Sequence, residues 1–270
     1  MGRIEDAFAR RSAEGKKALI AYLCVGDPNE EESIDLALAC VEAGADILEL
    51  GCPFSDPTAD GPAIARASQR ALARGGGLAE TLRVAQAVRK KAPSVGMVLF
   101  GYYNPLFVRG EDRAAIEVAR AGIDALLVVD LPVDEAGGLR HSAAAQGLGV
   151  VPLVAPTTKD VRIARIAAVA KSSPVPFVYY VSMMGVTGGA GATDVFAEAG
   201  AKAAHVRELT GKPTVVGFGI DSPERARIAA KQADGVVVGT AIVRRIEEGE
   251  NAAARVESVR SFVASLRSAV

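Results

Sequence analysis

Short apolar segments alternate with longer helical patterns from one end of this 270-residue chain to the other. Most of the apolar segments are continuous runs of Val, Ile and Leu, which is typical of parallel strands that are buried on both faces. The predicted strands are Ala18–Cys24, Ile47–Leu50, Val95–Phe100, Ala125–Val129, Gly149–Leu153, Val175–Val181, Thr214–Gly217 and Gly235–Val238. Strand–helix units that repeat without a linker-like break predict an α/β fold, a single (β/α)8 TIM barrel over residues 1–270.

Helical patterns fill the intervals between these strands. The predicted helices are Glu31–Ala43, Pro62–Leu72, Leu78–Lys91, Asp112–Ala121, Lys159–Ala170, Ala197–Leu209 and Pro223–Gln232, with an extra N-terminal helix at Arg3–Ala13 and a last one at Ala252–Ser268. Asp-Pro and Ser-Pro pairs supply helix start signals after several strands. A doubly wound sheet is the alternative, but it requires a glycine fingerprint after the first strand, and the sequence 25–28 is not one.

Composition excludes several classes of function. Half of the residues are hydrophobic, and 31 Lys and Arg balance 32 Asp and Glu along the chain, so no basic patch indicates nucleic acid and no acidic tail a charge-driven partner. No apolar run approaches the ~20 residues of a membrane span, and the N-terminus lacks the apolar core of a signal peptide. We therefore expect a cytoplasmic protein that does not bind membranes.

The cysteines and histidines do not indicate a metal site. Cys24, Cys40 and Cys52 are odd in number and lack metal-ligand spacing, and His141 and His205 lie in predicted Ala-rich helices. We interpret the cysteines as small core residues, with Cys52 a candidate for lining a pocket.

Carboxylates gather where the second predicted strand ends. Glu49 lies among Ile47, Leu48 and Leu50, so its charge loses hydration and its pKa should rise, as a general acid/base requires. The loop that follows is punctuated by Pro and Gly and returns with Asp60. The alternative is that Glu49 faces solvent at the strand end and that Asp56 and Asp60 serve only turns.

Polar residues follow the carboxyl ends of other predicted strands as well. These are Asp27 after the first strand, Tyr102, Tyr103 and Asn104 after the third, Asp130 after the fourth, and Thr187 with Gly188 after the sixth. Because the site of a TIM barrel lies at this end of the strands, the asymmetry favours a small-molecule enzyme.

Glycines after the last three strands predict a phosphate site. They occur in the segments 182–192, 217–220 and 239–241, where backbone N–H groups can approach an anion closely. A short helix that starts at Thr240 after the eighth strand would add its unpaired amides. The segment 182–192 could also close over the site as a lid; the alternatives are tight turns and a disordered surface loop.

These segments resemble the tryptophan synthase α subunit family over nearly the whole chain. The most specific motif is Glu49-Leu50-Gly51-Cys52-Pro53-Phe54-Ser55-Asp56-Pro57, continued by Asp60-Gly61-Pro62, and further matches lie at 22–28, 101–105, 130–132, 179–182, 185–188 and 217–220. The resemblance implies a lyase of L-tryptophan biosynthesis that cleaves indole-3-glycerol phosphate to indole and glyceraldehyde 3-phosphate by a retro-aldol reaction.

The resemblance also implies a role for individual residues. Glu49 is similar to the family's acid/base, and Asp60 to the residue that binds the indole N–H and stays ionised. Tyr22, Phe100, Leu127, Tyr179 and Thr187 would bind the substrate, and Gly188, Gly219, Gly239 and Thr240 its phosphate. An ordinary core tyrosine remains the alternative for Tyr179.

A partner is implied in the same way. The family pairs with a pyridoxal-phosphate-dependent β subunit in an α2β2 heterotetramer, so this subunit would need no cofactor or metal of its own. Pro53, Asp56, Asn104 and Phe107 would face that subunit.

Other functions stay open at this point. The chain could be a stand-alone indole-releasing lyase, a catalytically inactive barrel that activates a partner, or another phosphate-binding barrel such as indole-3-glycerol-phosphate synthase or a sugar-phosphate isomerase. A synthase would want a catalytic lysine at a strand end, whereas Lys17 lies at a strand start.

Overall fold

A computed structural model describes residues 2–181, 192–217 and 219–270, and its strands form one parallel sheet. The described strands pair in the order β5-β4-β3-β2-β1-β9-β8-β7-β6. Their bounds are β1 Ala18–Cys24, β2 Ile47–Gly51, β3 Gly96–Gly101, β4 Ala125–Val128, β5 Gly149–Val150, β6 Leu153–Val154, β7 Val178–Val181, β8 Thr214–Gly217 and β9 Gly235–Val238. Most of the predicted strand bounds therefore agree with the structure to within a residue or two.

The sheet closes on itself at β5 and β6, which are two pieces of the predicted fifth strand. β5 pairs with β4 and β6 pairs with β7, so the two ends of the sheet belong to one chain segment. Val151 N–H donates to the Leu126 carbonyl, and the Pro152 carbonyl accepts from Tyr179 N–H. The sequence predicts one continuous strand here. In the structure the strand is divided, because Pro152 has no N–H to donate to the ladder. The predicted barrel is confirmed.

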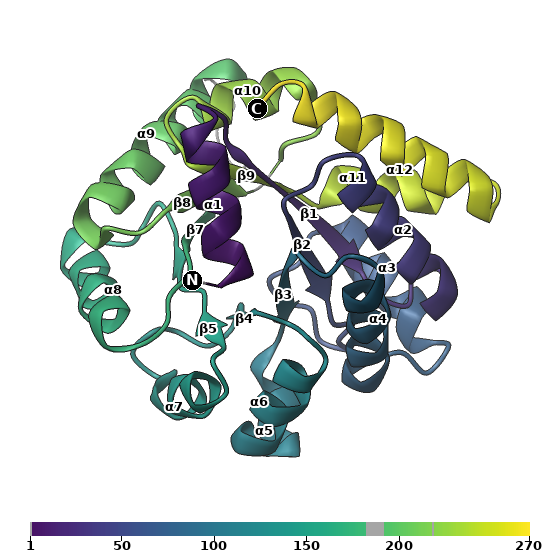
Figure 1. The fold of residues 1–270 in the computed structure, drawn as a ribbon, viewed down its shortest axis with the longest axis horizontal. Helices are drawn as coiled ribbons and strands as arrows, with labels where there is room; N and C mark the ends of the chain where they lie inside the picture. The colour runs from purple at the N-terminus through teal and green to yellow at the C-terminus, as the bar shows by residue number, and fades with distance from the viewer. Residues whose placement is uncertain (1, 182–191, 218) are drawn as a thin grey trace.

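Helices surround the strands, and α1 lies across the middle of the ring in Figure 1. Their bounds are α1 Arg3–Ala13, α2 Glu30–Glu42, α3 Pro62–Leu72, α4 Leu78–Lys91, α5 Tyr103–Arg109, α6 Glu111–Arg120, α7 Gly137–Ala145, α8 Asp160–Ser172, α9 Ala192–Thr210, α10 Pro223–Ala230, α11 Thr240–Glu248 and α12 Ala252–Arg267. α5 and α7 are additional to the prediction, and α9 begins earlier than predicted. Among the described residues no helix is both long and apolar enough to cross a membrane.

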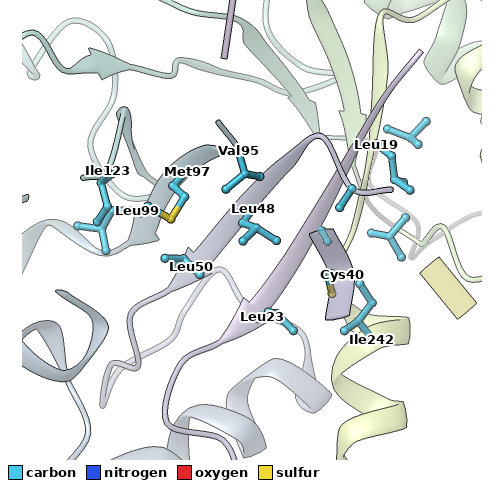
Figure 2. Packing of buried hydrophobic residues seen from close by; sticks show 14 of the residues in the cluster. Leu19, Leu23, Cys40, Leu48, Leu50, Val95, Met97, Leu99, Ile123 and Ile242 are labelled. Carbon is cyan, nitrogen blue, oxygen red and sulfur yellow. The ribbon is translucent and has the colours of Figure 1, made fainter. Parts of the chain in front are cut away.

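Two apolar layers explain the continuous hydrophobic strands. Alternate strand residues such as Ile20, Val98 and Val215 fill the interior of the barrel, where Phe8 of α1 packs on Phe177 with ring centroids 5.6 Å apart. The residues between them pack outward against the helices. Figure 2 shows this outer layer, in which Leu19, Leu23, Leu48, Leu50, Met97 and Leu99 of three strands lie with Cys40 of α2 and Ile242 of α11.

Three aspartates tie the amino ends of the strands together. Asp46, Asp124 and Asp234 directly precede β2, β4 and β9, and each accepts a hydrogen bond from a backbone N–H of the neighbouring strand, at 3.0, 2.8 and 2.9 Å respectively. Each also binds arginine. Asp46 is 3% exposed and binds Arg10 and Arg11 of α1 and Arg267 of α12 at 2.7 to 2.9 Å. These ties lie at the end of the barrel that the predicted site does not use.

Candidate active site

A cavity of about 1290 Å³ opens at the carboxyl ends of the strands. It brings together most of the residues that the sequence predicts for a site. Those that line it are Tyr22, Glu49, Asp60, Phe100, Tyr179, Gly219, Gly239 and Thr240. They come from β1, β2, the loop before α3, β3, β7, and the segments that follow β8 and β9.

Glu49 is a buried carboxyl group that has no counter-charge within the part of the chain that the structure describes. It lies on the inner face of β2, paired in register with Tyr22 of β1 and Val98 of β3, and is 1% exposed. Its Oε1 atom has no hydrogen-bond partner among the described residues. Burial raises its pKa to about 8, so the group is mainly protonated at neutral pH. A protonated carboxyl with a free oxygen facing a cavity is suited to general acid catalysis.

Asp60 lies in a different environment, because Tyr102 supports it. Burial raises the pKa of Asp60 to about 6, and a hydrogen bond from the Tyr102 hydroxyl opposes part of that rise. The same hydroxyl accepts the backbone N–H of Ala59 at 2.9 Å, and its ring stacks on Phe54 at 5.0 Å. Asp60 is therefore mainly ionised at neutral pH while Glu49 is mainly protonated.

The support that Tyr102 gives to Asp60 was not predicted. The sequence marks Tyr102 only as one of several polar residues after the third strand, without a role. Its contact to the Asp60 loop spans 43 positions of the chain, so no local pattern signals it.

Two tyrosines lie over strand glycines next to Glu49. A Cβ atom at Gly51 would come within 2.4 Å of the Tyr22 hydroxyl, and one at Gly217 within 1.9 Å of the Tyr179 hydroxyl. Glycine is thus required at both positions for the rings to occupy their places. Burial raises the pKa of both phenols well above the ordinary range, so the rings stay neutral and shape the cavity wall. Phe100 meets Tyr22 edge to face, with centroids 5.1 Å apart.

Another part of the cavity wall offers backbone donors for an anion. Gly219 has a positive φ of 72°, a conformation that favours glycine, and Gly239 precedes the first residue of α11. The carbonyl of Gly239 accepts the N–H groups of Ile242 and Val243, so the amides of Thr240 and Ala241 precede the first intrahelical hydrogen bonds. A helix N-terminus of this kind attracts phosphate.

Some predicted residues do not reach the cavity. Leu127 is fully buried in the interior cluster of the barrel, and the cavity wall on that strand is formed by Val128 and Val129. Leu127 and Val129 are two residues apart and share the inner face, so Leu127 packs in the core below the level at which Val129 lines the cavity. Thr187 and Gly188, with the predicted lid up to residue 191, lie outside the described residues.

The predicted partner-facing residues differ in exposure. Pro53 is buried, so its side chain is not available on the surface of the isolated chain. Asp56 and Asn104 are exposed, and α5 presents Phe107 at 62% exposure and Val108 at 77%. Asp130 accepts the first amide of α5 from Tyr103 at 2.8 Å, which places this helix at the carboxyl end of the barrel.

The closed parallel barrel, with two carboxyl groups of unlike protonation and an anion-binding helix start at its carboxyl end, defines a (β/α)8-barrel enzyme with an acid/base site. A family model described as "Tryptophan synthase alpha chain" matches residues 8–270, and the chain belongs to that family. It is 42% identical over 270 residues to the tryptophan synthase alpha chain of Xanthomonas axonopodis pv. citri, covering 100% of this chain and 99% of that one.

Two further comparisons agree. The alpha chain of Citrifermentans bemidjiense is 43% identical over 270 residues, covering 100% of this chain and 98% of the relative. The crystal structure of tryptophan synthase subunit alpha from Legionella pneumophila str. Paris superposes with a TM-score of 0.89 at 34% identity, covering 100% of this chain and 98% of that chain.

Proposed function

We propose that this chain is the lyase subunit that cleaves indole-3-glycerol phosphate to indole and glyceraldehyde 3-phosphate in L-tryptophan biosynthesis. The observation that carries the proposal is the protonated, buried Glu49 in the same cavity as ionised Asp60, in a chain of the tryptophan synthase alpha chain family. One oxygen of Glu49 has no partner among residues 2–181, 192–217 and 219–270.

The proposed chemistry assigns separate tasks to the two carboxyl groups. Glu49 donates its proton to the indole C3, and ionised Asp60 binds the indole N–H and stabilises the positive charge of the resulting indoleninium. Glu49, now a carboxylate, then accepts the proton of the adjacent side-chain hydroxyl. The O–H electrons form the aldehyde C=O, the C–C bond breaks, and its electrons return to the ring. A carboxyl group with a pKa of about 8 is matched to both proton transfers near neutral pH.

The phosphate binds at the far end of the cavity in this proposal. The amides that follow Gly219 and Gly239, with Thr240 at the start of α11, supply donors and a helix dipole for its charge. Tyr22, Phe100 and Tyr179 form an apolar wall that suits the indole ring. The positions predicted at Thr187 and Gly188 would complete this site.

We further propose that the chain folds as one domain, works in the cytoplasm and pairs with a β subunit in an α2β2 assembly. Pyridoxal phosphate belongs to that β subunit in the proposal, and this subunit requires no cofactor or metal, since two carboxyl groups supply the proton transfers. The exposed Phe107 and Val108 of α5, with exposed Asn104 in the same helix and exposed Asp56 in the loop after β2, support a docking surface at the carboxyl end.

The test is the release of indole from indole-3-glycerol phosphate by the purified chain, alone and with a tryptophan synthase β subunit. We expect slow release by the chain alone and a sharp increase with the β subunit. Fast release that the β subunit does not change would indicate a stand-alone lyase. No release by the chain under either condition would contradict the lyase and favour an inactive barrel that only activates its partner.

A further inference from the structure

Asp27 is one of the strand-end polar residues that do not line the cavity. It follows β1 and is 3% exposed. Both of its carboxylate oxygens accept hydrogen bonds from Arg70 of α3, from Nε at 2.8 Å and from Nη2 at 2.7 Å. This forked geometry fixes the orientation of the guanidinium plane as well as its position.

The same guanidinium reaches a third element. Arg70 Nη1 donates to Oε1 of Glu247 in α11 at 2.8 Å. Arg66, one turn earlier in α3, adds a second fork to Glu247 at 2.8 and 2.7 Å. The four charged groups Asp27, Arg70, Glu247 and Arg66 therefore join the end of β1, α3 and α11 in one continuous network.

Each of these elements carries or adjoins a group of the proposed site, Tyr22 in the case of β1. α3 begins at Pro62, two residues after Asp60, and α11 begins at Thr240. α3 and α11 are regular helices that pack directly on each other. Their relative position therefore sets the separation between the two ends of the cavity.

We propose that Arg70 is a positioning residue that holds the Asp60 end of the site at a fixed separation from the phosphate-binding end. This inference rests on the proposed function, because the separation of the two ends affects the binding only of a substrate that contacts both. A lysine cannot replace the arginine, since its ammonium group cannot fork to Asp27 and bind Glu247 at the same time.

A change at Glu247 can test this positioning role with little effect on the free energy of unfolding. The Arg66 and Arg70 side chains are 51% and 35% exposed, and exposed ion pairs contribute little to the free energy of unfolding. The variant Glu247→Gln leaves the fork between Arg70 and buried Asp27 intact. It therefore loosens α11 relative to α3 without leaving a buried charge unpaired.

The experiment compares steady-state kinetics of indole release by wild type and Glu247→Gln, each as the full chain with the β subunit. We expect the KM for indole-3-glycerol phosphate to rise about tenfold, less than the hundredfold that an ångström of misplacement can cost. Inhibition by inorganic phosphate, which contacts only one end of the site, should change less than about twofold, because the local donors of α11 are untouched. The thermal midpoint should stay unchanged.

Three further variants sharpen the result. Glu42→Gln removes a comparable ion pair, to Arg260 at 2.9 Å between α2 and α12, and should leave all kinetic constants unchanged. Arg70→Lys should lower kcat/KM at least as much as Glu247→Gln. Arg66→Gln keeps the bond between Arg70 and Glu247 and should resemble wild type.

The inference is overturned if Glu247→Gln has a wild-type KM, if phosphate inhibition weakens in parallel with substrate binding, or if Arg66→Gln reproduces the defect. Failure of the proposed function itself is recognised separately, because the wild-type chain would then release no indole; the positioning role would be withdrawn with it.

Discussion

Burial gives the two carboxyl groups of the site different protonation states at neutral pH. Glu49 has a pKa of about 8 and Asp60 one of about 6. If Glu49 must be protonated and Asp60 ionised, kcat/KM for indole release should follow a bell with limbs near pH 6 and pH 8. Asp60→Asn should be slow and should lose the acid limb. A rate that continues to rise above pH 8 would contradict the assigned proton donor.

The raised pKa of Glu49 also predicts how stability depends on pH. The folded chain holds this proton more tightly than the unfolded chain, whose Glu pKa is about 4.3. The stabilising contribution is complete below that value and is lost as pH rises through about 8. Glu49→Gln should therefore gain stability relative to wild type between pH 5 and pH 9, measured as urea midpoints. Parallel pH curves for the two proteins would refute the buried, protonated state.

Tyr102→Phe tests the support of Asp60. The change removes the hydroxyl that hydrogen bonds Asp60 and leaves the Ala59 N–H without its acceptor, while the ring can still stack on Phe54. The pKa of Asp60 should rise, so the acid limb of the kcat/KM profile should move to higher pH and activity at pH 6 should fall by about tenfold. Tyr103→Phe, which loses only a bond to Glu111, is the matched control. An unmoved acid limb would exclude the role.

A site residue could be predicted from the sequence where the pattern that marks it lies in adjacent residues. Glu49 and Asp60 were predicted because a charge inside an apolar strand and a loop of Pro and Gly are visible in adjacent residues. The contacts of Tyr102 and Arg70 each cross 43 positions and depend on the closed barrel. The position of Leu127 below the cavity was not predicted, because a sequence does not show at which level of the barrel the packed core gives way to the cavity.

At the scale of elements, continuous apolar runs predicted the strands and the barrel. The split of the fifth strand follows from Pro152, whose effect on pairing was overlooked. α7 begins with two glycines, and α5 has seven residues with Pro105 in its first turn, so neither shows a strong helical pattern. Their positions are set by tertiary contacts such as the bond from Tyr103 N–H to Asp130.

The aspartate ties predict a strong dependence of stability on Asp46. Asp46→Asn removes the buried carboxylate that Arg10, Arg11 and Arg267 share, although Arg11 keeps its ion pair with Glu14 at 2.8 Å, and removing one partner of a buried ion pair costs about 3–5 kcal/mol. Asp221→Asn, which breaks a half-exposed pair with Arg225, should cost less than about 1 kcal/mol. Urea denaturation of both variants measures the difference. Equal costs would show that burial of Asp46 does not matter.

At the scale of the whole molecule, the exposed end of α5 predicts where the β subunit docks. Phe107→Ser should weaken binding to a β subunit at least tenfold in calorimetric titration, because large aromatic side chains often dominate an interface. Leu209→Ser, at an exposed apolar residue of α9, should bind like wild type. Equal affinity of the Phe107 variant and wild type would place the partner on another surface.

The placement of the aspartate ties at the amino ends, opposite the cavity, has a consequence for evolvability. Residues at the carboxyl ends can be exchanged without disturbing the contacts that hold the strands in register. A library randomised at Tyr22, Phe100 and Tyr179 should therefore retain far more folded members than one randomised at Asp46, Asp124 and Asp234. Substitutions at the carboxyl ends of the strands can therefore change the substrate, while the contacts at the amino ends maintain the fold.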